Sequence, residues 1–179
     1  NLTTLLSNGV HVVCGTTGWL EHLPTIETLT KENNAAFFYA SNFSIGVNIF
    51  FKLNKVLAKI MNNYSNDYDV EMEEIHHIHK LDAPSGTAIT LAEGVMESFE
   101  NKQQWTLDKA ENTRDLKIVA KRIDEVPGTH VVDYKSHIDS IEIKHTAHNR
   151  TGFATGAVIS AEWLKDKKGV FGMEDMLKL

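Results

Sequence analysis

The first part of the chain alternates short apolar runs with one amphipathic stretch. Residues 10–14 (VHVVC) and 35–40 (AAFFYA) are apolar runs, and helical spacing begins at Thr25 between them. A buried strand, a helix and a second buried strand form one βαβ unit, whose parallel strands end at the same edge of a sheet. The preceding stretch NLTTLLSNG predicts the end of a helix, with Gly9 in the left-handed position that follows it.

The apolar period changes after Ser44. A helix is predicted there with one apolar face, formed by Ile45, Ile49, Leu53, Val56, Leu57 and Ile60. Residues 68–77 alternate apolar and acidic side chains, which indicates a strand with one exposed face. An amphipathic helix follows over 86–100, opened by Ser85 or Thr87, whereas 101–114 is polar and predicts a loop or a short helix.

The last third predicts strands and then a helix. Three strands, 116–123, 129–136 and 139–147, are expected to form an antiparallel meander; an apolar helix follows near 153–166, and 169–179 reads as a short helix or tail. This order predicts an α/β plus α+β protein. A partial Rossmann-like nucleotide-binding domain, residues 1–43 and 151–179, would carry an inserted α+β domain, residues 44–150, built on a mostly antiparallel or mixed sheet.

Composition narrows the class of protein. The chain has 18 Lys and Arg against 24 Asp and Glu, a net charge of −6, which disfavours nucleic acid and anionic membranes as partners. The single cysteine excludes an internal disulfide and suits a reducing cytoplasm. No apolar run approaches the ~20 residues that a membrane span requires. A cytoplasmic protein is therefore expected.

The stretch HHIHKLDAPSGTA concentrates possible proton carriers in front of a helix. His76, His77, His79 and Lys80 fall within five residues. The unpaired N–H groups of a helix start attract anions, Gly86 allows close approach to the backbone, and Thr87 adds a hydroxyl. Pro and Ser at a helix start are ordinary by themselves, but the crowded imidazoles favour a carboxylate site with proton donors beside it.

Metal binding is the main alternative chemistry for these histidines. Zinc sites on helices use two histidines four residues apart, whereas a strand would place only His77 and His79 on one face. No cysteine or Glu-x-x-His completes a set nearby, and the ammonium of Lys80 would repel a dication. No metal site is expected. A histidine-based metalloprotein is kept as an alternative to be tested. Cys14 is expected to be a small core residue.

Four blocks resemble those of a known family. EIHHIHKLDAPSGTA, GTTGW, ASNFSIGVN and HTAHNRTGFATGAV occur in the order found in dihydrodipicolinate (4-hydroxy-tetrahydrodipicolinate) reductases, and the resemblance covers nearly the whole chain. It implies reduction of 4-hydroxy-tetrahydrodipicolinate to tetrahydrodipicolinate with NADH or NADPH, in the diaminopimelate pathway to lysine. It also implies a small cyclic dicarboxylate as substrate and a cytoplasmic homotetramer formed through the sheet of the inserted domain.

The resemblance also implies residue roles. His76 corresponds to the acid/base residue and Lys80 to the proton donor. His77, Gly86 and Thr87 correspond to substrate contacts. The residues that correspond to cofactor contacts are Gly15, Thr16, Thr17, Ala40, Ser41, Asn42 and Phe43. A bound dicarboxylate should raise the pKa values of the imidazole and the ammonium and keep both protonated.

The other histidines are not expected to belong to the site. Exposed or half-buried packing is expected for the remaining histidines of the strand region, which are His130, His137, His145 and His148. Asp82 and Arg150 are assigned no role.

One family feature is not found in these residues. The Gly-rich fingerprint that binds the cofactor pyrophosphate does not occur, so the chain is expected to begin inside a fold. An alternative function is therefore a non-catalytic dicarboxylate-binding fragment. The residues that distinguish NADH from NADPH are likewise not among the predicted contacts.

Overall fold

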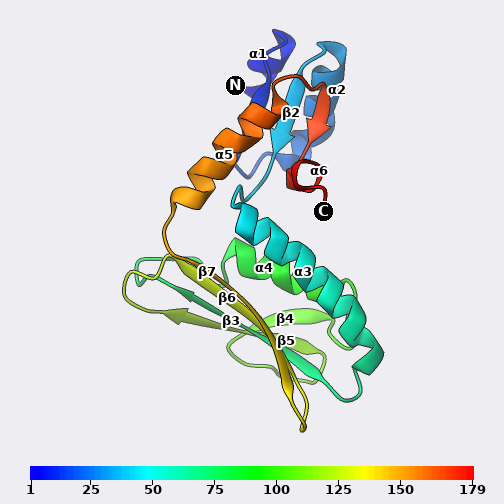
Figure 1. Cartoon of the computed structure of the whole chain (residues 1–179), viewed down its shortest axis with the longest axis vertical. Coiled ribbons are helices and arrows are strands. Elements are labelled where there is room, and N and C mark those ends of the chain that lie inside the picture. Colours follow the sequence, from blue (N-terminus) through cyan, green and yellow to red (C-terminus); the bar gives the residue numbers. More distant parts are fainter. The chain divides into compact units, whose positions relative to one another are not determined.

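The computed structural model describes all 179 residues, which form two compact units. Unit 1 comprises residues 1–48 and 151–179, and unit 2 comprises residues 49–150 (Figure 1). The chain thus enters unit 2 within helix α3 (Ile45–Met61) and leaves it just before helix α5 (Thr151–Leu164).

Unit 1 is a parallel three-stranded sheet with helices on both faces. The strand order is β1–β2–β8. Phe37 and Phe38 of β2 point to opposite faces, and each belongs to a separate apolar cluster, so both faces are buried. The elements are α1 (Leu2–Ser7), β1 (Val12–Cys14), η1 (Leu20–His22), α2 (Leu23–Glu32), β2 (Ala36–Tyr39), α5, β8 (Gly169–Phe171) and α6 (Met173–Leu177).

Unit 2 is a mixed five-stranded sheet covered on one face by α3 and α4 (Figure 1). The order is β4–β5–β3–β6–β7; β3 runs parallel to β5 and antiparallel to β6. The elements besides α3 are η2 (Asn62–Tyr64), β3 (Asp69–His76), α4 (Gly86–Met96), β4 (Gln104–Leu107), β5 (Asp115–Arg122), β6 (Gly128–Lys135) and β7 (Ser140–Ala147).

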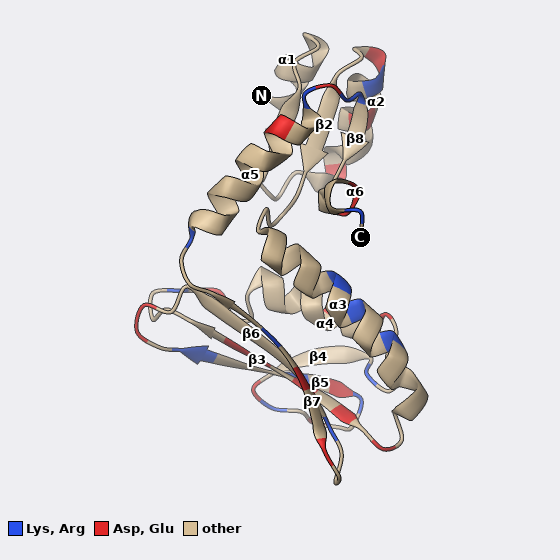
Figure 2. Ribbon diagram, viewed as in Figure 1, with Lys and Arg blue, Asp and Glu red and all other residues tan.

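The two faces of the unit 2 sheet differ in chemistry. The face beneath the helices is apolar, with Met72, Ile118 and Val132 fully or almost fully buried. The opposite face carries ion pairs between strands, such as that between Glu71 and Lys117 at 2.6 Å. Figure 2 shows acidic and basic residues along these strands.

The structure confirms the mixed α/β class and most of the predicted elements. Gly9, at a φ of 70°, occupies the left-handed position after α1, and Cys14 is buried in the core of unit 1. No helix has the length and apolar character needed to span a membrane.

Three element predictions are wrong. Residues 104–107 form strand β4, although this short strand carries no buried, alternating apolar pattern. The tail contains strand β8, whose three residues are too few to show a period. The antiparallel meander is wrong for β5, which lies between β4 and β3 and is parallel to both, whereas β6 and β7 pair antiparallel as predicted. A strand's own pattern does not specify its neighbours.

The apolar face predicted for α3 is only partly the face that packs. Ile45 and Leu57 contact the apolar cores, whereas Ile49, Leu53, Val56 and Ile60 are 47–52% exposed. The helix instead buries Phe50, Asn54, Ala58 and Met61, which follow the same helical spacing. Because α3 is apolar around much of its circumference, spacing alone did not identify the side that packs on the sheet.

Candidate functional site

The unit 2 site begins at the last inward positions of strand β3. The side chains of β3 alternate between faces, and Val70, Met72, Glu74 and His76 take the inward positions beneath the helices. The strand period thus places a carboxylate and an imidazole where the preceding positions hold core residues. A buried polar pair of this kind needs partners.

Glu74 obtains those partners from two other segments. Its side chain is fully buried, Oε2 accepts the backbone N–H of Ser85 at 3.1 Å, and Oε1 lies 3.1 Å from Nη2 of Arg122. Arg122 ends strand β5, the parallel neighbour of β3, and its register places it opposite His76. The buried carboxylate is therefore both paired and hydrogen-bonded.

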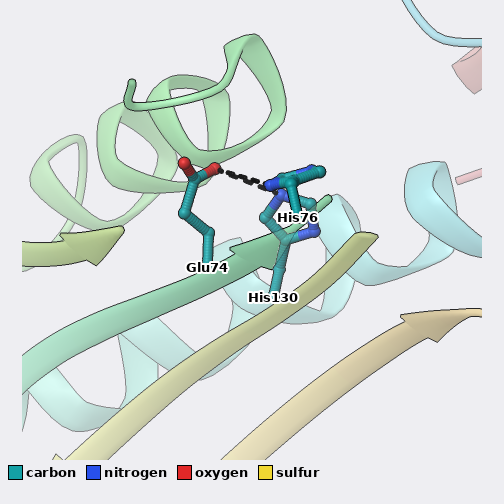
Figure 3. Close-up of side chains that lie close together, drawn as sticks. All are labelled: Glu74, His76 and His130. Carbon is teal, nitrogen blue, oxygen red and sulfur yellow. Dashed lines mark ion pairs between the residues drawn. The ribbon is translucent and has the colours of Figure 1, made fainter. Parts of the chain in front are cut away.

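Two histidines face this carboxylate. Nδ1 of His76 lies 3.5 Å from Oε2 of Glu74, and Nε2 of His130 lies 3.8 Å from the same oxygen. The two imidazole rings are nearly perpendicular, with centroids 5.1 Å apart. Figure 3 shows the three side chains directed toward one another from β3 and β6. His130 is buried, so the expectation that it was exposed or half-buried is wrong.

Burial favours the neutral form of both imidazoles. Desolvation lowers the pKa of His76, Lys80 and Arg122 lower it further, and the carboxylate of Glu74 opposes them. Desolvation, reinforced by His76, lowers the pKa of His130 to about 3. A protonated His76 would therefore require an additional negative charge beside the ring, as the anionic substrate would supply.

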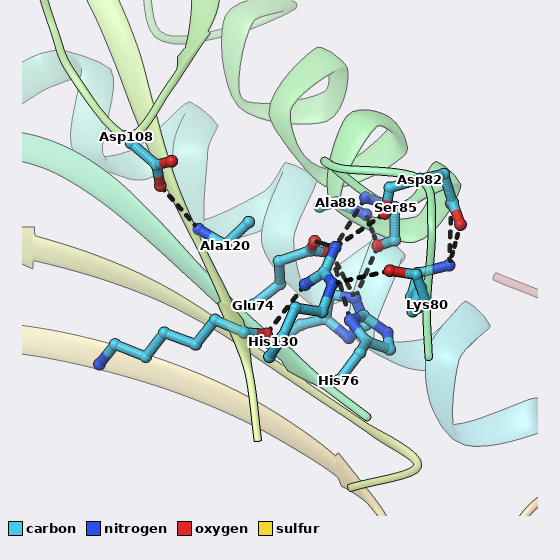
Figure 4. Close-up of polar contacts among 11 residues, drawn as sticks. Glu74, His76, Lys80, Asp82, Ser85, Ala88, Asp108, Ala120 and His130 are labelled. Carbon is cyan, nitrogen blue, oxygen red and sulfur yellow. Dashed lines mark hydrogen bonds and ion pairs between the residues drawn. The ribbon is translucent and has the colours of Figure 1, made fainter. Parts of the chain in front are cut away.

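The loop after β3 places Lys80 beside this cluster. Its Nζ atom donates to both carboxylate oxygens of Asp82, each at 2.8 Å, and this ammonium lowers the pKa of Asp82. The guanidinium of Arg122 donates to the carbonyl oxygens of Lys80, at 3.3 Å, and Asp82, at 2.7 Å. Figure 4 shows these contacts converging on one loop. Arg122 therefore connects the loop to Glu74.

Helix α4 begins at the same place. Ser85 is its N-cap, and the hydroxyl oxygen accepts the N–H of Ala88 at 3.2 Å, which decides between the two predicted caps. Gly86 follows, with open space where a side chain would stand, and Thr87 is half-buried. The predicted carboxylate site is thus open at Gly86.

The remaining predicted residues of this loop lie past the end of β3. His77 is half-buried, whereas the side chain of His79 is 72% exposed and faces Glu125 at 3.7 Å. Arg150 is exposed at the end of unit 2.

The predicted cofactor residues lie in unit 1, at the carboxyl ends of two adjacent strands. Cys14 of β1 pairs with Tyr39 of β2, so the loops 15–17 and 40–43 begin side by side. Gly15 is needed there, because a Cβ atom would lie 3.0 Å from the Phe43 ring. This edge of a parallel sheet is where nucleotides bind, and the exposed Thr16, Thr17 and Ser41 fit such a ligand.

Phe43 differs from the other predicted cofactor residues because its side chain is buried. The Phe43 side chain is 8% exposed and packs on Phe38 in the core of unit 1, so only its backbone is available to a cofactor. A cavity of about 650 Å³ opens beside Thr16 and Trp19.

Comparison with known proteins identifies the family. Residues 46–177 match the family described as dihydrodipicolinate reductase, C-terminus. The 4-hydroxy-tetrahydrodipicolinate reductase of Christiangramia forsetii is 52% identical over 177 residues, which cover 99% of this chain and 73% of that protein. The chain belongs to the dihydrodipicolinate reductase family. This confirms the family and the class predicted from the sequence, an NAD(P)H-dependent oxidoreductase of diaminopimelate and lysine biosynthesis.

More distant members agree. The reductases of Methanosarcina acetivorans and Methanocaldococcus jannaschii are each 38% identical; the chain spans 65% and 66% of their lengths. A dipicolinate-bound dihydrodipicolinate reductase from Paenisporosarcina sp. TG-14 superposes with a TM-score of 0.78 at 26% identity, over 97% of this chain and 67% of that one. The fold of the family is therefore present across both units.

Three residues of the site were not predicted from the sequence. Glu74 could have been predicted, since the strand period places it on the same face as His76. Arg122 and His130 had none, because the sheet brings them to Glu74 from other strands.

Proposed function

We propose that unit 2 binds the cyclic dicarboxylate substrate of the family and supplies the proton for its reduction, while the loops of unit 1 contact the nicotinamide cofactor. The observation that carries this proposal is the open helix start at Gly86, with His76 and Lys80 in the segment before it. Dipicolinate in the Paenisporosarcina enzyme is a planar dicarboxylate of the same kind.

One substrate carboxylate would bind at the N-terminus of α4. The N–H groups of Gly86 and Thr87 and the Thr87 hydroxyl are donors there, and the helix dipole adds partial positive charge. The ammonium of Lys80, on the loop that leads to α4, would supply a cation, and His77 would add a further donor when protonated. The site therefore suits a dianion.

The chemistry requires one hydride and one proton. Bound NADH or NADPH supplies the hydride, and Gly15, Thr16, Thr17, Ala40, Ser41, Asn42 and the Phe43 backbone would hold its nicotinamide end. His76 and Lys80 would deliver the proton to the substrate, whose 4-hydroxyl leaves as water. The substrate negative charge raises the pKa of the buried His76 imidazole, which opposes the effect of burial.

The assembly and location of the protein extend this proposal. A homotetramer would form through the outer face of the unit 2 sheet, where charged side chains such as Glu71 and Lys117 can pair with those of another copy. The reaction would take place in the cytoplasm, which contains the reduced cofactor and keeps a single free thiol reduced.

Calorimetric titration of metal-free protein with pyridine-2,6-dicarboxylate, with and without NADH, tests the proposal. Metal must be removed first because this ligand chelates. Saturable binding that NADH strengthens and Lys80→Ala weakens at least tenfold is expected, while Lys55→Ala, which loses an exposed ion pair with Glu97, should leave binding unchanged. Binding indifferent to NADH would favour a dicarboxylate-binding fragment without a cofactor site, and no binding would refute both functions.

Turnover of the complete protein provides the second test. His76→Ala and Lys80→Ala should each lower kcat strongly, by about a hundredfold or more, as expected for loss of a proton donor. Near wild-type kcat in both variants would refute the assigned roles.

A further inference from the structure

Glu74 connects the two proposed proton carriers with the start of α4. It is fully buried at a strand position where hydrophobic residues precede it, and a buried carboxylate is costly unless it is paired and hydrogen-bonded. Its two oxygens face three different segments: the ring of His76, the N-cap Ser85, and the guanidinium of Arg122. The following inference rests on the proposed role of His76.

We propose that Glu74, held by Arg122, is a positioning residue that fixes the Nδ1–H tautomer of His76 and so makes Nε2 the atom that exchanges the proton. Nδ1 of His76 is buried without a hydrogen-bond partner, and Oε2 of Glu74 lies 3.5 Å from it. A modest closing of this distance forms the hydrogen bond that orients the ring. Carboxylates fix histidine tautomers in this way in catalytic triads and metal sites.

The opposite edge of the imidazole has space provided by a glycine. A Cβ atom on Gly128, the first residue of β6, would stand 3.1 Å from Nε2 of His76. The glycine therefore avoids a side chain crowded against the exchanging nitrogen, whereas Nδ1 is buried. The two nitrogens occupy different environments, as the proposed division of roles requires.

Arg122 pairs with the carboxylate at its other oxygen. A buried carboxylate is costly unless a cation or hydrogen-bond donors contact it. The guanidinium lies 3.1 Å from Oε1, which leaves Oε2 to face the histidine. The same guanidinium binds the carbonyls of Lys80 and Asp82, so the pair also fixes the Lys80 loop relative to His76.

Glu74 also contacts the start of α4, where the substrate carboxylate is proposed to bind. Oε2 accepts the N–H of Ser85, and the Ser85 hydroxyl caps α4 and lies 3.2 Å from Nε2 of His130. A shift of the carboxylate would therefore act on the helix start as well as on the imidazole. Loss of Glu74 should nevertheless lower kcat more than substrate affinity, because the Ser85 hydroxyl still caps α4 through Ala88, whereas proton transfer loses its defined tautomer.

A metal ion is the rival explanation for this cluster. The nearest ligand atoms of Glu74, His76 and His130 lie within 4.8 Å of one another. However, Arg122 and Ser85 already occupy both carboxylate oxygens, Ser85 also contacts His130, and a guanidinium would repel a dication. The geometry fits an orienting carboxylate better than a metal ligand.

The titration of His76 supplies a readout that a purely structural role would not change. The groups that face its ring are Glu74 on β3, Arg122 on β5, His130 on β6, and Lys80 and Asp82 on the loop. Glu74 is the nearest negative charge. Neutralising it should lower the pKa of His76 and move the basic limb of the kcat profile to lower pH by about one unit or more.

The first experiment compares Glu74→Gln with Glu97→Gln in the complete protein. Glu97 is ion-paired with Lys55 at 2.7 Å on the exposed C-terminal end of α4, so its variant controls for loss of a paired carboxylate. Glu74→Gln should lower kcat tenfold or more, change KM less, and shift the kcat profile to lower pH. Glu74→Asp should restore part of kcat, and Glu97→Gln should match the wild type.

A spectroscopic arm remains decisive even if Glu74→Gln fails to fold. Histidine ¹⁵N shifts of wild-type protein near pH 8 should report the Nδ1–H tautomer for His76. A predominant Nε2–H tautomer would overturn the proposal, as would a folded Glu74→Gln variant with wild-type kcat and pH profile. Stoichiometric zinc in purified wild-type protein that Glu74→Gln abolishes would also overturn it.

Failure of the proposed function would appear differently. Wild-type turnover in His76→Ala would remove the acid/base role itself, whereas a lost turnover in His76→Ala with an unaffected Glu74→Gln would remove only the positioning role.

Discussion

The ammonium of Lys80 is held by both carboxylate oxygens of Asp82, each at 2.8 Å. The Asp82 side chain is 62% exposed, so this pair is screened by water and contributes little, about 0–1 kcal/mol. In the proposed function, a substrate carboxylate would compete with Asp82 for this cation.

Asp82→Asn should therefore tighten dicarboxylate binding. The substitution removes a negative charge that repels the ligand and leaves Lys80 available, so we expect a several-fold lower Kd for pyridine-2,6-dicarboxylate at low salt. Calorimetry at 50 and 500 mM salt measures it, and the gain should shrink at high salt. Weaker binding of the variant would instead mean that Asp82 orients Lys80 for the ligand.

Binding of the dicarboxylate should be coupled to proton uptake. Burial keeps the pKa of His76 below its usual value, so the ring is neutral near pH 7.5, and an adjacent dianion raises that pKa. Affinity should therefore fall as the pH rises. Titrations in buffers of different ionisation enthalpy should show fractional proton uptake that His76→Ala removes and that His79→Ala, at an exposed position, retains. Equal uptake by both variants would contradict the assignment.

The sequence predicted those parts of the site that lie within one continuous segment. Residues 76–87 carry their chemistry in order along the chain, so proton carriers and helix start could be recognised together. The carboxyl ends of β1 and β2 were predictable because parallel strands share an edge. Unit 2 was less predictable because β5 inserts beside β3, and only that sheet order brings Arg122 to Glu74.

Burial was harder to predict than secondary structure. His130 and Glu74 are adjacent only through the β3–β6 register, so nothing local to His130 indicated that it is buried. The face of α3 that packs on the sheet was missed because apolar side chains lie on several of its sides. In both cases the missing information was which surfaces meet, and local periodicity does not contain it.

His130 should make the protein sensitive to acid. Its pKa in the folded state is about 3, far below the usual 6.5, so the unfolded chain binds a proton that the folded chain refuses. The free energy of unfolding should fall as pH decreases from about 6.5 toward 3, by at most about 5 kcal/mol for this group. Urea unfolding at pH 7.5 and 4.5 should show a smaller difference in His130→Gln than in wild type. His137→Gln, at an exposed position, should retain the full difference.

Helix α5 packs on the loop that follows β2 through a glycine. A Cβ atom on Gly156 would lie 1.8 Å from the carbonyl oxygen of Phe43, a backbone atom that cannot move aside without shifting the predicted cofactor loop. Gly156→Ala should therefore destabilise unit 1 by about 1–3 kcal/mol, despite the better helix propensity of alanine. Gly152→Ala on the same helix is the matched control, because its Cβ would meet only the Ser44 hydroxyl at 3.8 Å, and it should be neutral or slightly stabilising. Thermal unfolding of both variants measures the effect. Equal stability of the two variants would show that the loop after β2 adapts easily, and would weaken the view that α5 fixes the position of residues 40–43.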